Sequence, residues 1–179
     1  MRRIAVIGNG GGGKSTLSRA LGERLGIPVH EVDIVQWRTG WERAPLDETA
    51  TILDGWAAEE AWIIDGFGPL PVLDRRFDRA DTIVHVDHAF TQHLWWAAKR
   101  EVATRLSGKS WGGRRLPTKS VLLAKTLRRV HAMRPQLLEM TSRGDRAGKL
   151  VHLRSPAEMR RWLDSVDRIA VSRPTSRDR

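Results

Sequence analysis

The sequence feature that most constrains this chain is a glycine-rich segment at residues 8–15, which reads Gly-Asn-Gly-Gly-Gly-Gly-Lys-Ser. It follows a short apolar run at residues 3–8 and opens residues 14–25, where apolar side chains recur at helical spacing. The segment satisfies the pattern G-x-x-x-x-G-K-[ST] in the strand-loop-helix context that this pattern requires. A flexible glycine-rich turn is the alternative, and the flanking strand and helix argue against it. We therefore predict a loop whose backbone N–H groups converge on phosphate oxygens.

The pattern also assigns roles to the polar residues of this loop. Lys14 is expected to reach the β- and γ-phosphates of a nucleotide, Ser15 to ligate Mg²⁺, and Thr16 to assist from the same helical turn. We expect ATP with Mg²⁺ as cofactor, although no side-chain pattern separates ATP from GTP. The predicted nucleotide-binding residues of the loop are Gly8, Asn9, Gly10, Gly11, Gly12, Gly13, Lys14, Ser15 and Thr16.

Strand and helix patterns alternate along the rest of the chain. This βαβ alternation predicts an α/β fold with a parallel five-stranded sheet. The expected strands are residues 3–8, 27–32, 61–65, 81–86 and 150–153. The expected helices are residues 14–25, 46–60, 72–77, 90–106, 119–141 with a kink at Pro135, and 156–166.

The same patterns predict one domain over residues 1–170, with no internal repeat and no linker. Residues 107–118 break the periodicity with glycines, a proline and several cations, so we predict a mobile lid there. Residues 171–179 are predicted to be a disordered tail.

Three aspartates follow predicted strands, namely Asp33, Asp65 and Asp87. A nucleotide site that uses Mg²⁺ needs a carboxylate at the end of a neighbouring strand, where it holds the ion directly or through water. Asp65 is the preferred metal residue because it ends an apolar run and precedes Gly66, and Asp87 is the second choice. The alternative for each is a carboxylate that caps the following loop or helix.

Arginines gather around the predicted lid. Transfer of a phosphoryl group spreads negative charge over its oxygens, and lid arginines stabilise that charge and exclude water. Arg100 and Arg105 are the preferred catalytic pair, and a solvated helix face is the alternative for each. The other candidates are Arg114 and Arg115 in the lid and Arg128, Arg129 and Arg134 beyond it.

Several of these segments resemble a family. Residues 62–67, Trp-Ile-Ile-Asp-Gly-Phe, look like the Asp-Gly-Phe segment of adenylate kinases. Residues 1–165 resemble the adenylate kinase-like proteins called DNA topology modulation proteins. The further segments that carry this likeness are His30-Glu31-Val32-Asp33, Trp37, Gly40-Trp41, Arg75-Arg76 and Arg79-Ala80-Asp81-Thr82.

The resemblance implies a three-layer fold of the nucleoside monophosphate kinase type. It further implies an acceptor-binding insertion at residues 33–60 and an arginine-bearing lid. Adenylate kinases use a Pro-Arg after Asp-Gly-Phe to serve AMP, whereas Gly68 and Pro69 follow here, so the likeness does not name the acceptor. Such proteins hold adenine after the last strand, where Arg154 is placed to stack on the base. A plain helix start with Ser155 as N-cap is compatible with that role.

Asp33 and the neighbouring tryptophans are candidates for acceptor binding. Asp33 could orient or deprotonate an acceptor hydroxyl, which makes it a predicted catalytic residue. Trp37 and Trp41 could stack on an acceptor ring or pack within the insertion. Three histidines close in sequence are interpreted as solvated or structural rather than as a transition-metal site. They are His85, His88 and His93.

Amino-acid composition excludes some kinds of site and indicates the charge of the ligand. The absence of cysteine excludes disulfides and thiolate zinc sites. No apolar run approaches the roughly 20 residues of a membrane span, and the N-terminus lacks a signal-peptide core, so we expect a cytoplasmic protein. Residues 1–90 hold 10 Lys and Arg against 14 Asp and Glu, whereas residues 91–179 hold 21 against 7. Such a basic half suits a polyanionic ligand.

Two functions fit these observations. The first is a phosphotransferase that moves the γ-phosphoryl group of Mg-ATP to a small acceptor, either a nucleotide or a hydroxyl compound. The alternative is a nucleotide-responsive protein that binds nucleic acid through its basic half with little or no turnover. Phosphorylation of a nucleic acid end would combine both.

Overall fold

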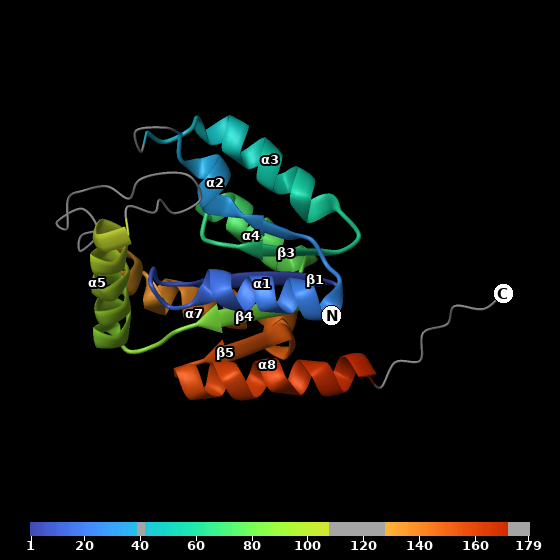
Figure 1. The fold of residues 1–179 in the computed structure, drawn as a ribbon. Coiled ribbons are helices and arrows are strands. Elements are labelled where there is room, and N and C mark those ends of the chain that lie inside the picture. The colour runs from blue at the N-terminus through green and yellow to red at the C-terminus, as the bar shows by residue number, and fades with distance from the viewer. Residues whose placement is uncertain (39–41, 108–127, 172–179) are drawn as a thin grey trace.

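Five short parallel strands form one sheet at the centre of the molecule (Figure 1). Their spatial order is β2-β3-β1-β4-β5, and all four neighbouring pairs are parallel. This confirms the predicted α/β fold with a five-stranded parallel sheet. The strands are β1 (Arg3–Gly8), β2 (Val29–Glu31), β3 (Trp62–Asp65), β4 (Thr82–Val86) and β5 (Leu150–Leu153).

The computed structural model describes residues 1–38, 42–107 and 128–171, without the side chains of 97, 100, 101, 104–107 and 167–171. The helices are α1 (Lys14–Leu25), α2 (Val32–Gln36), α3 (Leu46–Ala58), α4 (Leu70–Arg79), α5 (Phe90–Ser107), α7 (Arg134–Ser142) and α8 (Pro156–Val171), with a 3-10 helix η1 (Gly144–Lys149). The short helix α2 was not predicted. Residues 128–132 are helical and end just before α7, which confirms a break next to Pro135. The predicted lid beyond Ser107 and the tail beyond Val171 lie outside the described residues.

The sheet is covered on both faces, because alternate side chains of each strand enter two different apolar clusters. In β1, Ala5 and Ile7 join the cluster that contains residues of α3, α4 and α7. Ile4 and Val6 join the cluster that contains residues of α1 and α8. All four of these β1 side chains are fully buried. The result is three layers, helix on sheet on helix, as the resemblance implies.

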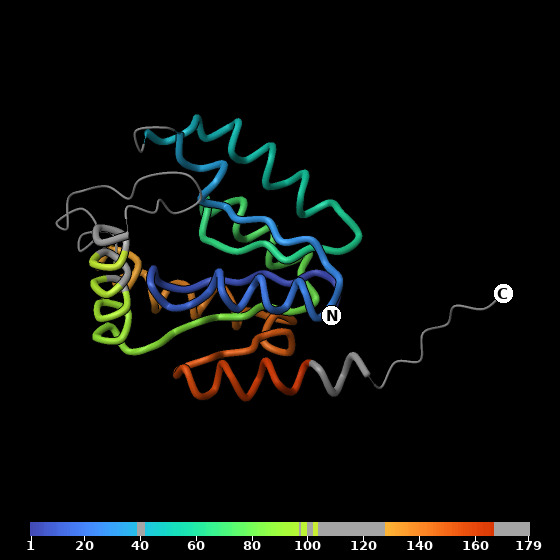
Figure 2. The backbone as a smooth tube through the Cα atoms, viewed as in Figure 1, coloured from blue at the N-terminus to red at the C-terminus, as the bar shows by residue number. Residues whose placement is uncertain are grey.

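The carboxyl ends of the parallel strands meet at one edge of the sheet. In Figure 1 this edge is at the left, where α5 stands across the ends of the strands. The backbone trace shows the turn after β1 beside α5 (Figure 2). In sheets of this type ligands bind at that edge.

Residues 33–60 form α2, the described part of the following loop, and α3, which packs on α4 and β3. Arg75 of α4 binds Asp54 of α3 with a 2.6 Å ion pair. At the start of this segment His30 stacks on Trp56 with ring centroids 4.6 Å apart and contacts Glu59 at 3.0 Å. The end of the predicted insertion is therefore tied both to α4 and to β2.

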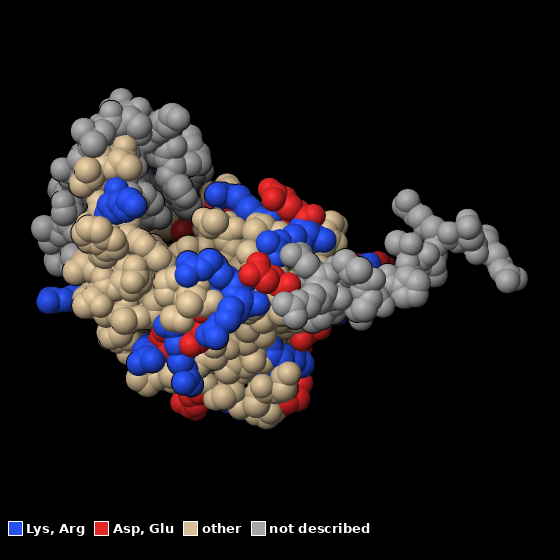
Figure 3. All heavy atoms as spheres, turned by 60° about the horizontal axis from the view of Figure 1, so that its bottom comes forward, with Lys and Arg blue, Asp and Glu red and all other residues tan. Residues whose placement is uncertain are grey.

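The surface carries both signs of charge. On the face seen in Figure 3, turned forward from the α8 side, Lys and Arg side chains lie among Asp and Glu side chains. Two ion pairs link α1 to its neighbours, Arg19 to Glu31 at 2.8 Å and Arg24 to Asp164 at 4.0 Å. Among the described helices, none is both long and apolar enough to cross a lipid bilayer.

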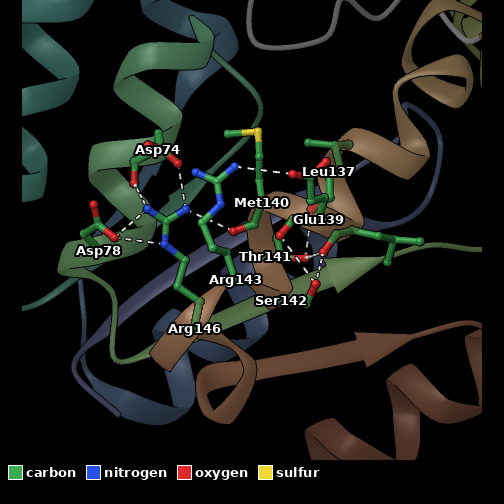
Figure 4. Close-up of polar contacts among 10 residues, drawn as sticks. Asp74, Asp78, Leu137, Glu139, Met140, Thr141, Ser142, Arg143 and Arg146 are labelled. Carbon is green, nitrogen blue, oxygen red and sulfur yellow. Dashed lines mark hydrogen bonds and ion pairs between the residues drawn. The ribbon is translucent and has the colours of Figure 1, made fainter.

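A buried arginine joins the last part of the chain to α4 (Figure 4). Arg146 of η1 is only 5% exposed and donates to Asp74 at 2.6 Å and to Asp78 at 2.5 Å. It also donates to the Met140 carbonyl at 3.0 Å, and its guanidinium lies 5.8 Å from the centre of the Phe77 ring. Because charge-assisted hydrogen bonds are the stronger ones, this residue fixes η1 and the end of α7 against α4.

Arg146→Ala is expected to lower the free energy of unfolding by about 2 kcal/mol, since it removes several charge-assisted hydrogen bonds and a buried side chain. Arg143→Ala is the matched control. Arg143 is exposed, follows α7 as its C-cap and pairs with Glu139 of that helix at 3.5 Å, so its loss should cost less than about 0.5 kcal/mol. Urea unfolding of both variants measures the difference. Equal losses would contradict the assigned role of Arg146.

Candidate functional site

The glycine-rich loop begins at Gly8, where the backbone of β1 lies very close to the backbone of β4. A Cβ at Gly8 would lie 2.1 Å from the Val86 carbonyl oxygen of β4, so only glycine fits there. Gly13, which precedes α1, has a φ of 79°, in the left-handed region that glycine adopts at little cost. The loop therefore turns tightly from the centre of the sheet into the N-terminus of α1, as the sequence predicts.

Polar groups within the glycine-rich loop form hydrogen bonds with one another. The Gly10 N–H donates to Asn9 Oδ1 at 2.8 Å, and Lys14 Nζ donates to the Asn9 carbonyl at 2.9 Å. The first helical bond of α1 runs from the Leu17 N–H to the Gly13 carbonyl at 2.9 Å. The N–H groups before Leu17 thus lie at a helix N-terminus, where the helix dipole and unpaired donors favour an anion.

Asp65 lies at the end of β3 beside this loop. Val6 of β1 is its partner in the sheet register, and its side chain is 4% exposed. Burial raises the pKa of Asp65 above its ordinary value, while the charge of Lys14 and a hydrogen bond from Ser15 act in the opposite direction. The predicted metal residues Ser15 and Asp65 are therefore neighbours.

One oxygen of this carboxylate, Asp65 Oδ1, is buried and has no hydrogen-bond partner among the described residues. A buried carboxylate oxygen without a donor is costly unless a ligand supplies the missing interaction. Oxygen ligands from a carboxylate and a hydroxyl are those that Mg²⁺ prefers. Asp65 and Ser15 thus fit a magnesium ion.

Two further carboxylates approach Asp65. Asp33 and Glu31 both raise the pKa of Asp65 by charge repulsion. Glu31 is the register partner of Asp65 on β2, and Asp33 lies exposed in the first turn of α2. Trp37 follows α2 with the guanidinium of Arg43 over its ring, 5.3 Å from the centre. Trp41, the other predicted stacking residue, lies outside the described residues.

Asp87, the second choice for the metal, has a different environment. Arg134 Nε donates to both of its oxygens at 2.7 and 2.9 Å, and His152 Nε2 contacts Asp87 Oδ2 at 2.7 Å. Burial raises the pKa of Asp87, but the hydrogen bonds from His152 and Arg134 outweigh it and hold the pKa below its usual value. Both oxygens are engaged, so Asp87 anchors the start of α7.

The three clustered histidines are buried rather than solvated. His85, His88 and His93 are each at most 3% exposed. Burial lowers the pKa of His85 and of His93 to about 4, so both rings are neutral at physiological pH. In the described part of the chain no three metal-ligating side chains come together. All three histidines line a small cavity together with Gly8 and Asn9 of the glycine-rich loop.

The chain after β5 also reaches the loop. Met159 of α8 lies with its methyl carbon 3.3 Å from where a Cβ at Gly13 would be. The Glu158 N–H donates to Ser155 Oγ at 3.2 Å, and α8 begins at Pro156, so Ser155 is the N-cap as predicted. Arg154 is exposed immediately before this turn. Its contact with the nucleotide base stays a prediction.

The structure leaves the arginine predictions open. Arg100 and Arg105 lie on α5, but their side chains are outside the described residues, as are Arg114 and Arg115. Arg134, named only as a further candidate, is an arginine that the structure brings to the end of β4, where it binds Asp87. Sequence spacing did not single it out, because its partner Asp87 is 47 residues away.

Comparison with known proteins supports the fold. The sequence matches no model of a known protein family and no curated protein. Similar solved structures include shikimate kinase from Acinetobacter baumannii in complex with shikimate (14% identity, 96% of this chain and 94% of that chain covered, TM-score 0.61). Others are shikimate kinase from Aquifex aeolicus (18%, 96% and 99%, 0.51) and an uncharacterized protein from Eubacterium ventriosum (12%, 95% and 98%, 0.51). The chain thus shares the α/β fold of these shikimate kinase structures. The resemblance to DNA topology modulation proteins stays a prediction.

Asp65→Asn and Asp87→Asn should change stability in opposite directions. The raised pKa of Asp65 means that the folded state binds its proton more tightly, so stability is lost as pH rises above the ordinary value of 3.8 through the folded pKa. At neutral pH Asp65→Asn should therefore raise the melting temperature of the ligand-free protein and weaken Mg-ATP binding about tenfold or more. Asp87→Asn should lower the melting temperature, because Arg134 and His152 lose a charged acceptor. Thermal melts with and without Mg-ATP test both, and shifts of one sign would contradict the assignment.

Replacement of His85 should flatten the pH dependence of stability. The folded protein holds this ring neutral with a pKa of about 4, whereas the unfolded value is 6.5. The unfolded state therefore binds more protons in this interval, and stability falls as pH falls from about 6.5 to about 4. This shift contributes at most about 3 kcal/mol. Urea unfolding across that range should show a smaller loss for His85→Leu than for wild type, and parallel curves would refute it.

Proposed function

We propose that the protein is an ATP-dependent phosphotransferase that moves the γ-phosphoryl group of Mg-ATP to a small acceptor. The observation that carries this proposal is the meeting of Lys14, Ser15 and the unsatisfied carboxylate of Asp65 at one end of the sheet. A loop that only bound an anion would need no buried carboxylate beside it. Phosphoryl transfer needs both phosphate donors and a metal-holding oxygen.

The contacts around the loop support an orientation for ATP. The phosphates would lie on the loop, with Lys14 released from Asn9 to reach the β- and γ-oxygens. The base would lie toward Arg154 and the start of α8, the element that touches Gly13. Ser15 and Asp65 would hold Mg²⁺, which neutralises charge on the β- and γ-oxygens when it is bound.

The acceptor would enter on the Asp33 side of the loop. Asp33 is exposed, and its charge is felt at Asp65, so it lies within reach of the same space. There it would orient an acceptor hydroxyl or take its proton. Arg100 and Arg105 on α5 are the proposed source of charge stabilisation during transfer. A similar structure is a kinase in complex with the small molecule shikimate, which favours a small acceptor here too.

The nucleic-acid alternative gains no support from the described surface. Of the 21 Lys and Arg in residues 91–179, eight fall in residues 108–127 and 172–179, outside the described part. On the face of Figure 3 Lys and Arg side chains lie among Asp and Glu side chains. A nucleic acid backbone is bound by a continuous basic stripe. We therefore treat this alternative as an outcome of the activity test below.

Lys14→Ala is expected to reduce acceptor-dependent ADP formation by about a hundredfold or more, because it removes the cation at the β- and γ-phosphates. The matched control is Lys149→Ala, which removes a lysine of η1 that pairs only with Asp145 among the described carboxylates. ADP release from Mg-ATP should be measured with nucleoside monophosphates, nucleosides, small hydroxy acids, sugars and short oligonucleotides.

One small acceptor should stimulate wild type and Lys149→Ala more than tenfold and leave Lys14→Ala inactive. Full turnover by Lys14→Ala would overturn the assigned site. Stimulation by oligonucleotides alone, or ATP-dependent oligonucleotide binding without turnover, would favour the nucleic-acid alternative.

A further inference from the structure

The side chain of His93 on helix α5 contacts the glycine-rich loop. His93 Nδ1 lies 3.0 Å from the Gly10 carbonyl oxygen, and the side chain is 1% exposed. A carbonyl oxygen only accepts hydrogen bonds, so Nδ1 must carry the hydrogen. With a pKa of about 4 caused by burial, the ring is neutral near pH 7 and has this one tautomer.

The His93 ring is also held by packing. A Cβ at Gly12 would lie 2.7 Å from His93 Cε1, so the ring rests directly against the glycine backbone. The ring also stacks on His88 with centroids 5.7 Å apart, and His88 meets the edge of Trp96. The His93 ring is therefore packed tightly between the glycine-rich loop and His88, which restricts its movement.

The loop has a particular need for such a contact. Residues 10–13 are four consecutive glycines, which lose more conformational freedom on ordering than any other residue. Lys14 contacts Asn9 within the loop, but this contact is lost if Lys14 reaches a phosphate. The His93 bond uses a carbonyl oxygen and leaves the loop N–H groups available for an anion. It can persist in both the empty and the occupied loop.

We propose that His93 is a positioning residue that pre-organises the glycine-rich loop for nucleotide phosphates and fixes α5 against it. The inference rests on the proposed function, because it concerns the same ATP site. Arg100 follows His93 by seven residues, about two helical turns, so the two Cα atoms lie on one face of α5. The bond to Gly10 thus also sets where the Arg100 Cα lies relative to the loop.

Two His93 variants that resemble each other in shape separate the effect of the hydrogen bond to Gly10 from the effect of packing. In His93→Asn the amide Nδ2 takes about the place of the histidine Nδ1 and can donate to Gly10. In His93→Leu the side chain has nearly the same size and no donor. Titration calorimetry with Mg-ATP should give a dissociation constant roughly fivefold higher for His93→Leu and within about twofold of wild type for His93→Asn.

A double variant tests the contact with Gly12. Gly12→Ala should weaken Mg-ATP binding in the wild-type background, since the new methyl group would meet His93 Cε1. In the His93→Asn background that carbon is absent, so the same substitution should cost at least threefold less affinity. Because residues in contact give non-additive effects, independence of the two changes would show that the His93 ring does not hold the loop at Gly12. Additivity would therefore overturn the inference.

Wild type and Lys14→Ala in the same titration distinguish failure of the inference from failure of the proposed function. If wild type binds Mg-ATP, Lys14→Ala does not, and His93→Leu binds as tightly as His93→Asn, the positioning role is wrong and the proposed function stands. If wild type does not bind Mg-ATP, the proposed function fails and the inference with it. Melting temperatures of the two His93 variants should agree within a few degrees, and a collapse of His93→Leu alone would assign the residue to folding instead.

Discussion

The position of β1 between β3 and β4 is the constraint on which the rest of the structure depends. Its register pairs Val6 with Asp65 and Gly8 with Val86, so the glycine-rich loop begins where both neighbouring strands end. Because β1 is apolar on both faces, shifting this register would move buried side chains out of two packed layers at once. The core of the molecule therefore determines the geometry of the site.

The two aspartates at this edge show how the same residue type acquires two roles. Asp87 receives hydrogen bonds from Arg134 and His152, and its negative charge is satisfied by the protein itself. Asp65 is buried with one oxygen unsatisfied among the described residues, and its pKa is raised. A cation would supply the missing interaction of Asp65 Oδ1. Both oxygens of Asp87 already have partners in Arg134 and His152. Their surroundings, rather than their positions after a strand, separate a metal residue from an anchor.

Interactions that are local in sequence could be predicted, and interactions between distant residues could not. The loop, α1 and the Trp62–Asp65 strand each have a continuous pattern, and the structure contains them at nearly the expected bounds. Helix α2 spans only five residues, too few for a helical period to be recognised. His93 was interpreted only as solvated or structural because its partner is a backbone carbonyl 83 residues earlier, which no side-chain pattern reports. The site predictions for the lid arginines remain predictions.

The buried side chain of Arg76 holds the backbone next to Asp65 and interacts with the charge of that carboxylate. Arg76 is 1% exposed and donates to the Gly66 and Phe67 carbonyls at 2.6 and 3.0 Å, which holds the backbone that follows Asp65. Burial lowers its pKa to about 10, while the charge of Asp65 opposes that change, so Arg76 stays charged at neutral pH. The charge of Asp65 thus makes the burial of the Arg76 charge less costly. The carboxylate that would hold Mg²⁺ is thus fixed through its backbone by a cation that does not itself occupy its unsatisfied oxygen.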